Sequence, residues 1–320
     1  MLSAAKKRRS TPQALELVLP ATSANLGPAF DAAALALNLF IKIRAQIANE
    51  FSLVVKGRDR DICGRRENNL IISTYREVLQ AEGKFAQPLM LEIENEIPIG
   101  KGCGSSAAAR LAGIALAVYF GKLRWNDAHI VGEASRREHH PDNAAACWMG
   151  GITVAKMSGP AEAQIAHIAP NGKWPLLLAV PETSLSTDSA RKALPEIYSR
   201  ADAVTNIQNS MMLLAAFSQG RHDLLSSALE DRMHEPYRAT LCELLEPLKR
   251  LPADSGTLGV ALSGAGPSVI IFLDGKARLS RAKLNIRNYL ASSNLFPELI
   301  EASISIRGAS KRGNWKQRKS

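Results

Sequence analysis

The chain has 320 residues, about twice the usual length of a domain, so we expect one large domain or two ordinary ones. Apolar residues make up 46% and charged residues 22% of the sequence, ordinary values for a globular protein that exclude a disordered or collagen-like chain. The formal net charge of +10 would indicate a nucleic-acid or anionic-membrane partner if it were spread over the folded body.

The excess positive charge instead lies at the two ends of the chain. Residues 1–15 hold four basic side chains and residues 307–320 hold six, and neither segment holds an acid. Without those ten, residues 16–306 contain 30 basic and 30 acidic side chains. We therefore expect a neutral folded body with two basic tails, residues 1–12 and 307–320.

Cysteines and hydropathy indicate a reducing compartment and no membrane span. The four cysteines are scattered, with no C-x-x-C spacing and no nearby histidine cluster, so neither a disulfide framework nor a zinc site is indicated. Charged residues such as Lys42 and Arg110 interrupt every long apolar run, and Glu16 breaks any secretory hydrophobic region after the cationic start. We expect a cytoplasmic protein.

Strands and helices alternate in the first half. The alternating Leu15, Leu17 and Leu19 predict a strand up to residue 20, and residues 40–45 and 51–55 predict two more. Apolar positions at helical spacing predict a helix over 69–80, which Gly83 ends. Residues 89–97 predict another strand, and the Ala/Leu-rich residues 105–120 predict a helix after a glycine-rich turn.

The second half has a similar mixture. Turn-forming residues over 158–174 predict a crossing between two domains, which we place near residue 165, giving domains of 13–165 and 166–306. Beyond it we expect a strand at 176–180, helices at 203–217 and 222–229, and a strand, glycine turn and strand over 259–273. The expected fold class is therefore α+β.

A glycine-rich loop directly before the predicted helix at 105–120 is the most informative segment. Three glycines in five positions permit close approach of a ligand, and the free N–H groups at the helix start suit a phosphate. Ser105 and Ser106 could cap the helix, bind phosphate oxygen or ligate a hard cation. The spacing fits neither a Walker A loop nor G-x-G-x-x-G. An ordinary strand-to-helix turn explains the glycines alone equally well.

Several segments together carry a family resemblance. Residues 98–109, PIGKGCGSSAAA, resemble the central P-x-x-x-G-x-G-S-S-A-A motif of the GHMP kinases. Residues 20–31, PATSANLGPAFD, resemble the opening motif of the branch that phosphorylates homoserine. The segments at 140–143 (HPDN), 231–238 (DRMHEPYR) and 262–268 (LSGAGPS) follow in the same order, and the resemblance covers residues 13 to 275.

The resemblance implies a fold and a nucleotide site. The fold would be a two-domain GHMP kinase fold, with an N-terminal domain like domain 2 of ribosomal protein S5 and a ferredoxin-like C-terminal domain. Asn69 would lie beside the purine of ATP. The triphosphate would be held by the loop residues Pro98, Ile99, Gly100, Lys101, Gly102, Cys103, Gly104, Ser105 and Ser106.

The resemblance also implies a magnesium ion, held by Ser106 and a glutamate upstream of H-P-D-N. Glu133 and Glu138 are both candidates. Gly132-Glu133 resembles the family's G-E pair, whereas Glu138 lies in an R-R-E-H-H run typical of a solvated turn, so Glu133 is preferred.

The implied acceptor substrate is L-homoserine, a zwitterion with a primary alcohol. Its carboxylate needs a cation and its ammonium needs a carboxylate. Arg191 and Arg238 would hold the carboxylate and Asp31 the ammonium. The pocket around the alcohol would be completed by Asn25, His140, Asn143 and Thr187.

The implied reaction is direct in-line transfer of the γ-phosphoryl group, which needs positioning and charge neutralisation more than covalent chemistry. Asn25, Asn143 and Arg191 are the expected catalytic residues. Other members of the family have an aspartate base where this sequence has Asn143, and an amide cannot take the proton. We expect the proton to leave through water or a phosphate oxygen.

One departure keeps alternatives open. Ala29 replaces a glycine of the opening motif and Ala33-Ala34 replace Leu-Gly, so a kinase of the same family acting on another small alcohol is the first alternative. If position 29 needs positive φ, alanine costs about 1 kcal/mol there. The second alternative is a nucleic-acid-binding protein using its basic tails. We expect no membrane or nucleic-acid partner, and the resemblance implies a homodimer.

Overall fold

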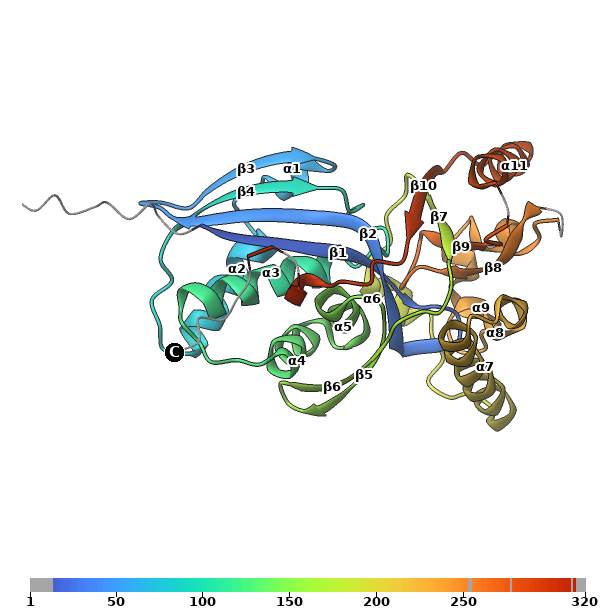
Figure 1. Ribbon diagram of the computed structural model, residues 1–320, viewed down its shortest axis with the longest axis horizontal. Helices are drawn as coiled ribbons and strands as arrows, with labels where there is room; N and C mark the ends of the chain where they lie inside the picture. Colours follow the sequence, from blue (N-terminus) through green and yellow to red (C-terminus); the bar gives the residue numbers. More distant parts are fainter. Residues whose placement is uncertain (1–13, 253–254, 277, 312, 315–320) are drawn as a thin grey trace, which may run out of the picture.

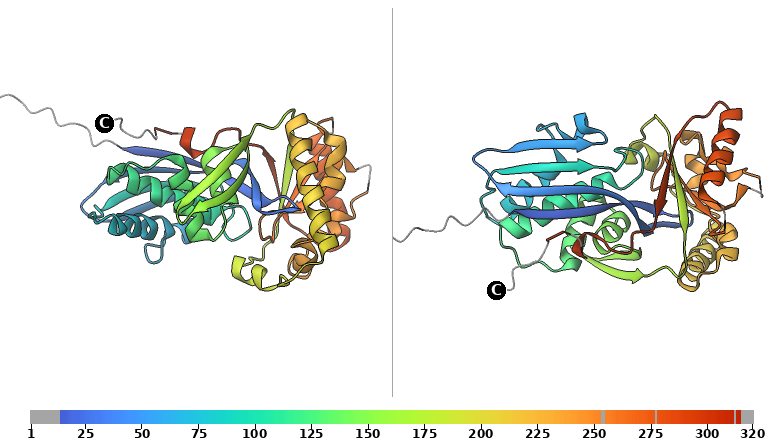
Figure 2. Two further views of the ribbon diagram at one scale, coloured as in Figure 1. Left: turned by 90° about the horizontal axis from the view of Figure 1, so that it is seen from below. Right: turned by 45° about the horizontal axis from the view of Figure 1, so that its top comes forward.

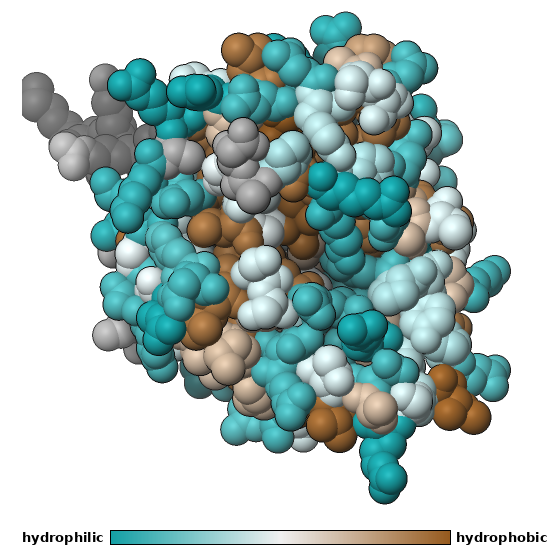
Figure 3. All heavy atoms as spheres, turned by 90° about the vertical axis from the view of Figure 1, so that its right-hand side faces the viewer, coloured by the Kyte–Doolittle hydropathy of each residue, from teal (hydrophilic) through white to brown (hydrophobic). Residues whose placement is uncertain are grey.

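The computed structural model describes residues 14–252, 255–276, 278–311 and 313–314. Two β-sheets, each with its own helices, lie side by side along the long axis of the molecule (Figures 1 and 2). The end built on the second sheet is mostly hydrophilic, with scattered apolar side chains (Figure 3). No helix in the described ranges is both long and apolar enough to cross a membrane.

The first sheet has six strands in the order β3-β4-β2-β5-β6, and β1 pairs with β2. Leu15, Leu17 and Leu19 are buried on one face, which the helices cover (Figure 1). The strands are β1 (Leu15–Asn25), β2 (Ala29–Ile47), β3 (Ser52–Gly57), β4 (Leu89–Asn95), β5 (Ile152–Gly159) and β6 (Glu162–Ile168). The helices are α1 (Arg60–Cys63), α2 (Leu70–Ala81), α3 (Ser105–Phe120), α4 (Asp127–Glu138) and α5 (Asp142–Met149).

The second sheet has the order β10-β7-β9-β8. Its central strands β7 and β9 are buried on both faces and almost continuously apolar, whereas the edge strand β10 mixes buried and exposed residues. Helices α10 and α11 cover one face, and α7 packs on the other through Leu213 and Phe217. The strands are β7 (Pro175–Val180), β8 (Thr257–Leu262), β9 (Val269–Leu273) and β10 (Glu298–Ser303). The helices include α6 (Thr187–Lys192), α7 (Arg200–Gln219), η1 (His222–Leu224), α8 (Leu225–Ala228), α9 (Glu235–Arg238), η2 (Ala239–Leu241), α10 (Leu245–Lys249) and α11 (Leu279–Ser292).

The α+β fold class and the predicted elements are confirmed, with α3 beginning and ending at the predicted residues. The predicted crossing segment contains a strand, β6, which pairs with β5 in the first sheet. The chain passes between the sheets after Ile168 and before Pro175, so residue 165 lies inside β6. The division into domains at 165 stays a prediction.

We call the first sheet with its helices the first unit, and the second sheet with its helices the second unit. The segment expected to be a tail from residue 307 is folded onto the first unit. After β10 the chain returns along β2, where Ser305 N donates to Ala36 O, and η4 (Ala309–Lys311) buries Ala309. Asn314 then bonds the start of β1, since its Nδ2 donates to Ala14 O. The expected tail is therefore wrong for the described residues 307–311 and 313–314, while residues 1–12 and 315–320 lie outside the described residues.

We expect the return segment, which runs from the end of β10 through η4, to contribute to the stability of the whole chain. A substitution at Gly308 tests this expectation. A Cβ at Gly308 would lie 2.3 Å from Trp148 O and 2.4 Å from Gly150 N, so the backbone must shift. Gly308→Ala should lower the free energy of unfolding in urea by about 1–3 kcal/mol.

The matched control is Gly159→Ala, whose added methyl group would meet only Glu162 side-chain atoms at 3.6 Å or more. It should change the free energy of unfolding by less than about 0.5 kcal/mol. Equal stabilities of the two variants would show that the return segment does not stabilise the fold.

Candidate active site

A cavity of about 110 Å³ lies where the two units meet. Six segments contribute to it, from the β1–β2 turn, the glycine loop, the α4–α5 connection, α6, α9 and the β8–β9 loop. It brings together most of the predicted site residues, namely Asn25, Asp31, Gly100, Gly102, Cys103, Gly104, Ser105, Ser106, His140, Asn143, Thr187, Arg191 and Arg238.

The glycine loop ends at the start of α3 in the way that an anion site requires. Gly100, Gly102 and Gly104 have φ of 70°, 76° and 69°, values that favour glycine. Gly104 caps α3, a 16-residue helix, and the N–H groups of its first turn open toward the cavity beside Ser105 and Ser106.

The loop is held in place by contacts that leave no room for side chains. A Cβ at Gly102 would lie 2.1 Å from Ser263 O, and a Cβ at Gly104 would overlap with Thr22 Oγ1. Ser263 Oγ donates to Gly102 O at 2.8 Å. The β8–β9 loop therefore supports the glycine loop from the second unit.

A larger, mostly apolar cavity of about 570 Å³ adjoins the glycine loop. It shares Gly100, Ser105 and Ser106 with the smaller cavity, and its lining includes Ile62, Cys63, Asn69, Leu70, Ile97 and Ile99. Asn69 holds this wall together: its Oδ1 caps α2 and its Nδ2 donates to Cys63 O at 3.0 Å.

Two residues of the predicted phosphate loop, Pro98 and Lys101, line neither of these cavities. Lys101 Nζ donates to Thr183 O at 2.7 Å and to Glu182 O, carbonyls in the segment before α6. Lys101 therefore joins the glycine loop to the second unit.

The structure brings Glu138, and not Glu133, to the serines. Glu138 Oε1 accepts hydrogen bonds from Ser106 Oγ at 2.6 Å and from Arg110 Nε. Its side chain is 11% exposed at the end of α4, so the expected solvated turn is wrong.

Glu133 lies five residues earlier on α4 and forms ion pairs with two arginines. Its carboxylate pairs with Arg136 at 2.8 Å and Arg137 at 3.1 Å. Burial favours the neutral acid, but these two cations outweigh burial and hold the pKa of Glu133 below its usual value. Sequence alone could not separate the two glutamates, because both precede H-P-D-N on one helix.

The start of α5 is organised by Asp142, which sequence reasoning did not select. Asp142 Oδ1 lies 2.6 Å from His140 Nδ1 and accepts from Asn143 N at 2.6 Å. Burial lowers the pKa of His140, but the adjacent carboxylate outweighs burial and raises it above its ordinary value. Thr22 Oγ1 donates to Asn143 Oδ1 at 2.6 Å, which fixes that amide. Both residues stand inside motifs already noted, at 140–143 and 20–31.

Asn25 ends β1 and Asp31 lies near the start of β2, on the two sides of the turn, and both have left-handed backbones, φ 69° and 54°. Asn25 Nδ2 donates to Gly264 O at 2.8 Å, and its Oδ1 accepts from Asp31 N at 3.0 Å. Arg191 Nη2 pairs with both oxygens of Asp31 at 2.8 and 2.9 Å. Ala29 does not have positive φ, so the expected cost of alanine there is not incurred.

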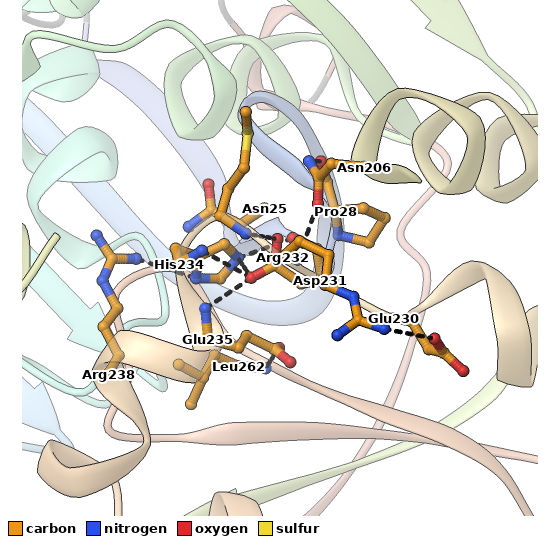
Figure 4. A network of polar contacts seen from close by, with 12 residues as sticks. Asn25, Pro28, Asn206, Glu230, Asp231, Arg232, His234, Glu235, Arg238 and Leu262 are labelled. Carbon is orange, nitrogen blue, oxygen red and sulfur yellow. Dashed lines mark hydrogen bonds and ion pairs between the residues drawn. The ribbon is translucent and has the colours of Figure 1, made fainter. Parts of the chain in front are cut away.

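Arg238 is a cation buried at the cavity without a counter-ion. It is 1% exposed, and its Nε donates to Ala190 O at 3.1 Å. Its Nη1 donates to His234 Nδ1 at 3.2 Å (Figure 4). Among the residues the structure describes, it forms no ion pair with a carboxylate. Burial and the neighbouring Arg191 lower the pKa of Arg238, so the site favours an incoming anion.

A buried network supports Arg238, and sequence reasoning missed its members (Figure 4). Asp231 Oδ2 accepts from His234 N at 2.7 Å and Glu235 N at 2.6 Å at the start of α9. His234 Nε2 lies 2.7 Å from Gly27 O, and its ring stacks on Phe30 with centroids 5.3 Å apart. The D-x-x-H-E spacing at 231–235 was the available signal.

Comparisons with known proteins agree with this arrangement. Residues 69–151 match the model of the GHMP kinases N terminal domain, and residues 213–292 match that of the GHMP kinases C terminal domain. The chain is 41% identical over 258 residues to a homoserine kinase of Solibacter usitatus, covering 81% of this chain and 84% of that protein.

Two solved structures share the fold. A putative homoserine kinase from Listeria monocytogenes has a TM-score of 0.70 at 26% identity, covering 92% of this chain and 97% of that one. The homoserine kinase from Cytophaga hutchinsonii has a TM-score of 0.77 at 21% identity, covering 94% and 98%. The two-domain fold expected from the sequence is confirmed.

The burial of His234 predicts a specific pH dependence of stability. Burial lowers the pKa of His234 below its ordinary value of 6.5, and Arg238 adds to this, against the opposing Asp231 and Glu235. The unfolded chain then binds the proton more readily, so the free energy of unfolding falls as pH drops through about 6.5, by up to about 1.4 kcal/mol per pH unit.

Urea unfolding of wild type and His234→Asn at a series of pH values measures this contribution. The variant should lose stability less steeply below about pH 6.5, since its side chain does not titrate there. The same slope in both proteins would contradict a lowered pKa for His234.

Proposed function

The chain belongs to the homoserine kinases of the GHMP kinase family, and from this premise we propose how its residues transfer a phosphoryl group from ATP to L-homoserine. The product is O-phospho-L-homoserine, the phosphate ester of the side-chain hydroxyl. The predicted family, enzyme class and function are confirmed by the comparisons.

The observation that carries the substrate assignment is the unpaired Arg238. A buried guanidinium without a counter-ion is costly unless an anion joins it. The α-carboxylate of an amino acid supplies that anion. Asp31, 31% exposed beside Arg191, supplies the negative charge for the substrate's ammonium group. The pair of opposite charges matches a zwitterion.

We assign the triphosphate of ATP to the glycine loop and its base to the apolar cavity. The open N–H groups at the start of α3 suit phosphate oxygens, because the helix dipole favours negative charge there. The cavity bounded by Ile62, Leu70 and Ile97 offers the apolar walls that a planar base requires.

Magnesium would be held by Ser106 and Glu138, in place of the Glu133 preferred from the sequence. A hydroxyl and a carboxylate oxygen side by side are the hard donors that this ion prefers, so the residues fit it. When bound, the ion offsets negative charge on the phosphates. Arg110 orients the Glu138 carboxylate.

The chain contributes positioning and charge to the transfer. Asn143 cannot act as a base, and Thr22 holds its Oδ1, which leaves its NH₂ group as a donor. Asn25 ties Asp31 to the β8–β9 loop and so acts on the substrate through Asp31. We assign no side-chain base, and the hydroxyl proton leaves to water or to a phosphate oxygen.

Thr187 and His140 complete the cavity around the alcohol in this assignment. A homodimer, implied by the family resemblance, and a cytoplasmic location, expected from the cysteines and hydropathy, stay proposals. The alternatives of another small alcohol and of nucleic-acid binding are not favoured, because the homoserine kinase relatives span most of this chain.

A coupled ADP-release assay tests the function. ADP should be released with L-homoserine and not with mevalonate or galactose. The sharpest comparison is 3-aminopropan-1-ol, which is homoserine without its carboxylate. It should lose at least about 100-fold in kcat/KM, because Arg238 then stays unpaired. Equal rates with the two compounds would contradict carboxylate recognition.

A pair of variants tests the magnesium ligand. Glu138→Gln should lower kcat at least about tenfold and raise the Mg²⁺ concentration for half-maximal activity. The control, Glu133→Gln, should leave the Mg²⁺ dependence unchanged and reduce stability, since Arg136 and Arg137 lose their partner. The reverse pattern would return the role to Glu133.

A further inference from the structure

We propose that His234 is a positioning residue that holds the Arg238 guanidinium through an unprotonated Nδ1, and thereby sets the affinity for the substrate's carboxylate. The inference rests on the proposed function and extends it to a residue outside the cavity lining. It also explains why the buried cation beside the cavity is anchored without being neutralised.

The hydrogen bonds of His234 select one tautomer. Nε2 lies 2.7 Å from the carbonyl oxygen of Gly27, which can only accept, so Nε2 carries the hydrogen. In the neutral ring Nδ1 is then a lone-pair acceptor. The group facing it at 3.2 Å is Arg238 Nη1, which can only donate. Both contacts are satisfied by this tautomer alone.

The surroundings keep the ring neutral. His234 is fully buried, stacked on Phe30, and its charged neighbours are Asp231, Glu235 and Arg238. Asp231 already accepts from three backbone N–H groups, and Glu235 accepts from Leu262 N and pairs with Lys249. Burial and Arg238 together outweigh these carboxylates and lower the pKa of His234.

A neutral anchor has a consequence that a carboxylate would not have. Arg191 is paired with Asp31 in the same cavity, so a substrate's carboxylate would share Arg191 with Asp31. Arg238 is held by two neutral acceptors, Ala190 O and His234 Nδ1, so its charge stays available. The guanidinium is thus oriented before the substrate arrives, which removes part of the ordering cost of binding. Arg238 is the cation that selects a carboxylate.

Two amide substitutions separate the two ring nitrogens. In His234→Asn, Oδ1 takes the place of Nδ1 and keeps an acceptor for Arg238. In His234→Gln, the amide nitrogen takes the place of Nε2 and keeps the donor to Gly27 O, but the acceptor is lost. Steady-state kinetics of the full chain, with each substrate varied in turn, compare both variants with wild type.

We expect His234→Gln to raise the KM for L-homoserine by about tenfold or more while the KM for ATP stays within about twofold. His234→Asn should raise the KM for L-homoserine by less than about threefold. A larger increase in His234→Asn than in His234→Gln would mean that His234 acts by supporting the Gly27 turn. Equal increases would mean that the Nδ1 acceptor has no special part in binding, and no increase in either would mean that Arg238 needs no anchor. Each result overturns the proposal.

A second measurement does not depend on activity or on the folding of a variant. In ¹⁵N NMR of the wild-type protein, His234 should show an unprotonated Nδ1 and a protonated Nε2 near neutral pH. The opposite tautomer, or a doubly protonated ring, overturns the inference even in an active enzyme. Wild-type protein that releases no ADP with L-homoserine would instead refute the proposed function, and the tautomer would still be decided by NMR.

Discussion

The site depends on close contacts among strand β1, the glycine loop and the β8–β9 loop, which leave no space for side chains at Gly102 and Gly104. Gly102 lies against the carbonyls of Ser263 and Gly266, and Gly104 lies against the side chain of Thr22. These contacts join β1 and the glycine loop to the β8–β9 loop, and so fix one unit against the other. The start of α3 and the buried arginine of α9 line one cavity because of these contacts.

The two arginines of the cavity differ in the groups that hold them. Two arginines lie near the same aromatic ring, with guanidinium carbons 5.6 and 5.3 Å from the centroid of Phe30. One is paired with Asp31, and the other is held by neutral groups alone. The neutral formal charge of residues 16–306 is therefore compatible with a buried positive charge at Arg238, since placement and burial decide the local field.

Periodicity and glycine placement predicted α3 and the strands whose own apolar patterns are clear, such as β1, β4, β7 and β9. They did not predict β5, β6 or β10, nor the helices α4, α5 and α11. The motifs also selected residues that are far apart in the sequence and line one cavity in the structure, such as Asn25 and Arg238. The predictions that failed, and the residues that were missed, depend on contacts between segments, which no local sequence pattern contains. The choice between Glu133 and Glu138 is decided by Arg136 and Ser106, and the roles of Thr22, Asp142 and His234 by partners in other segments.

The return of the chain onto β1 has a consequence for synthesis. Ala14 and Glu16, among the first described residues, bond Asn314, and Gly308 fills a space beside Trp148. A ribosome makes these partners about 300 residues apart, so the first unit cannot be completed until the second has almost wholly emerged. The two units should therefore mature together, and a truncation near residue 300 would leave the first unit unfinished.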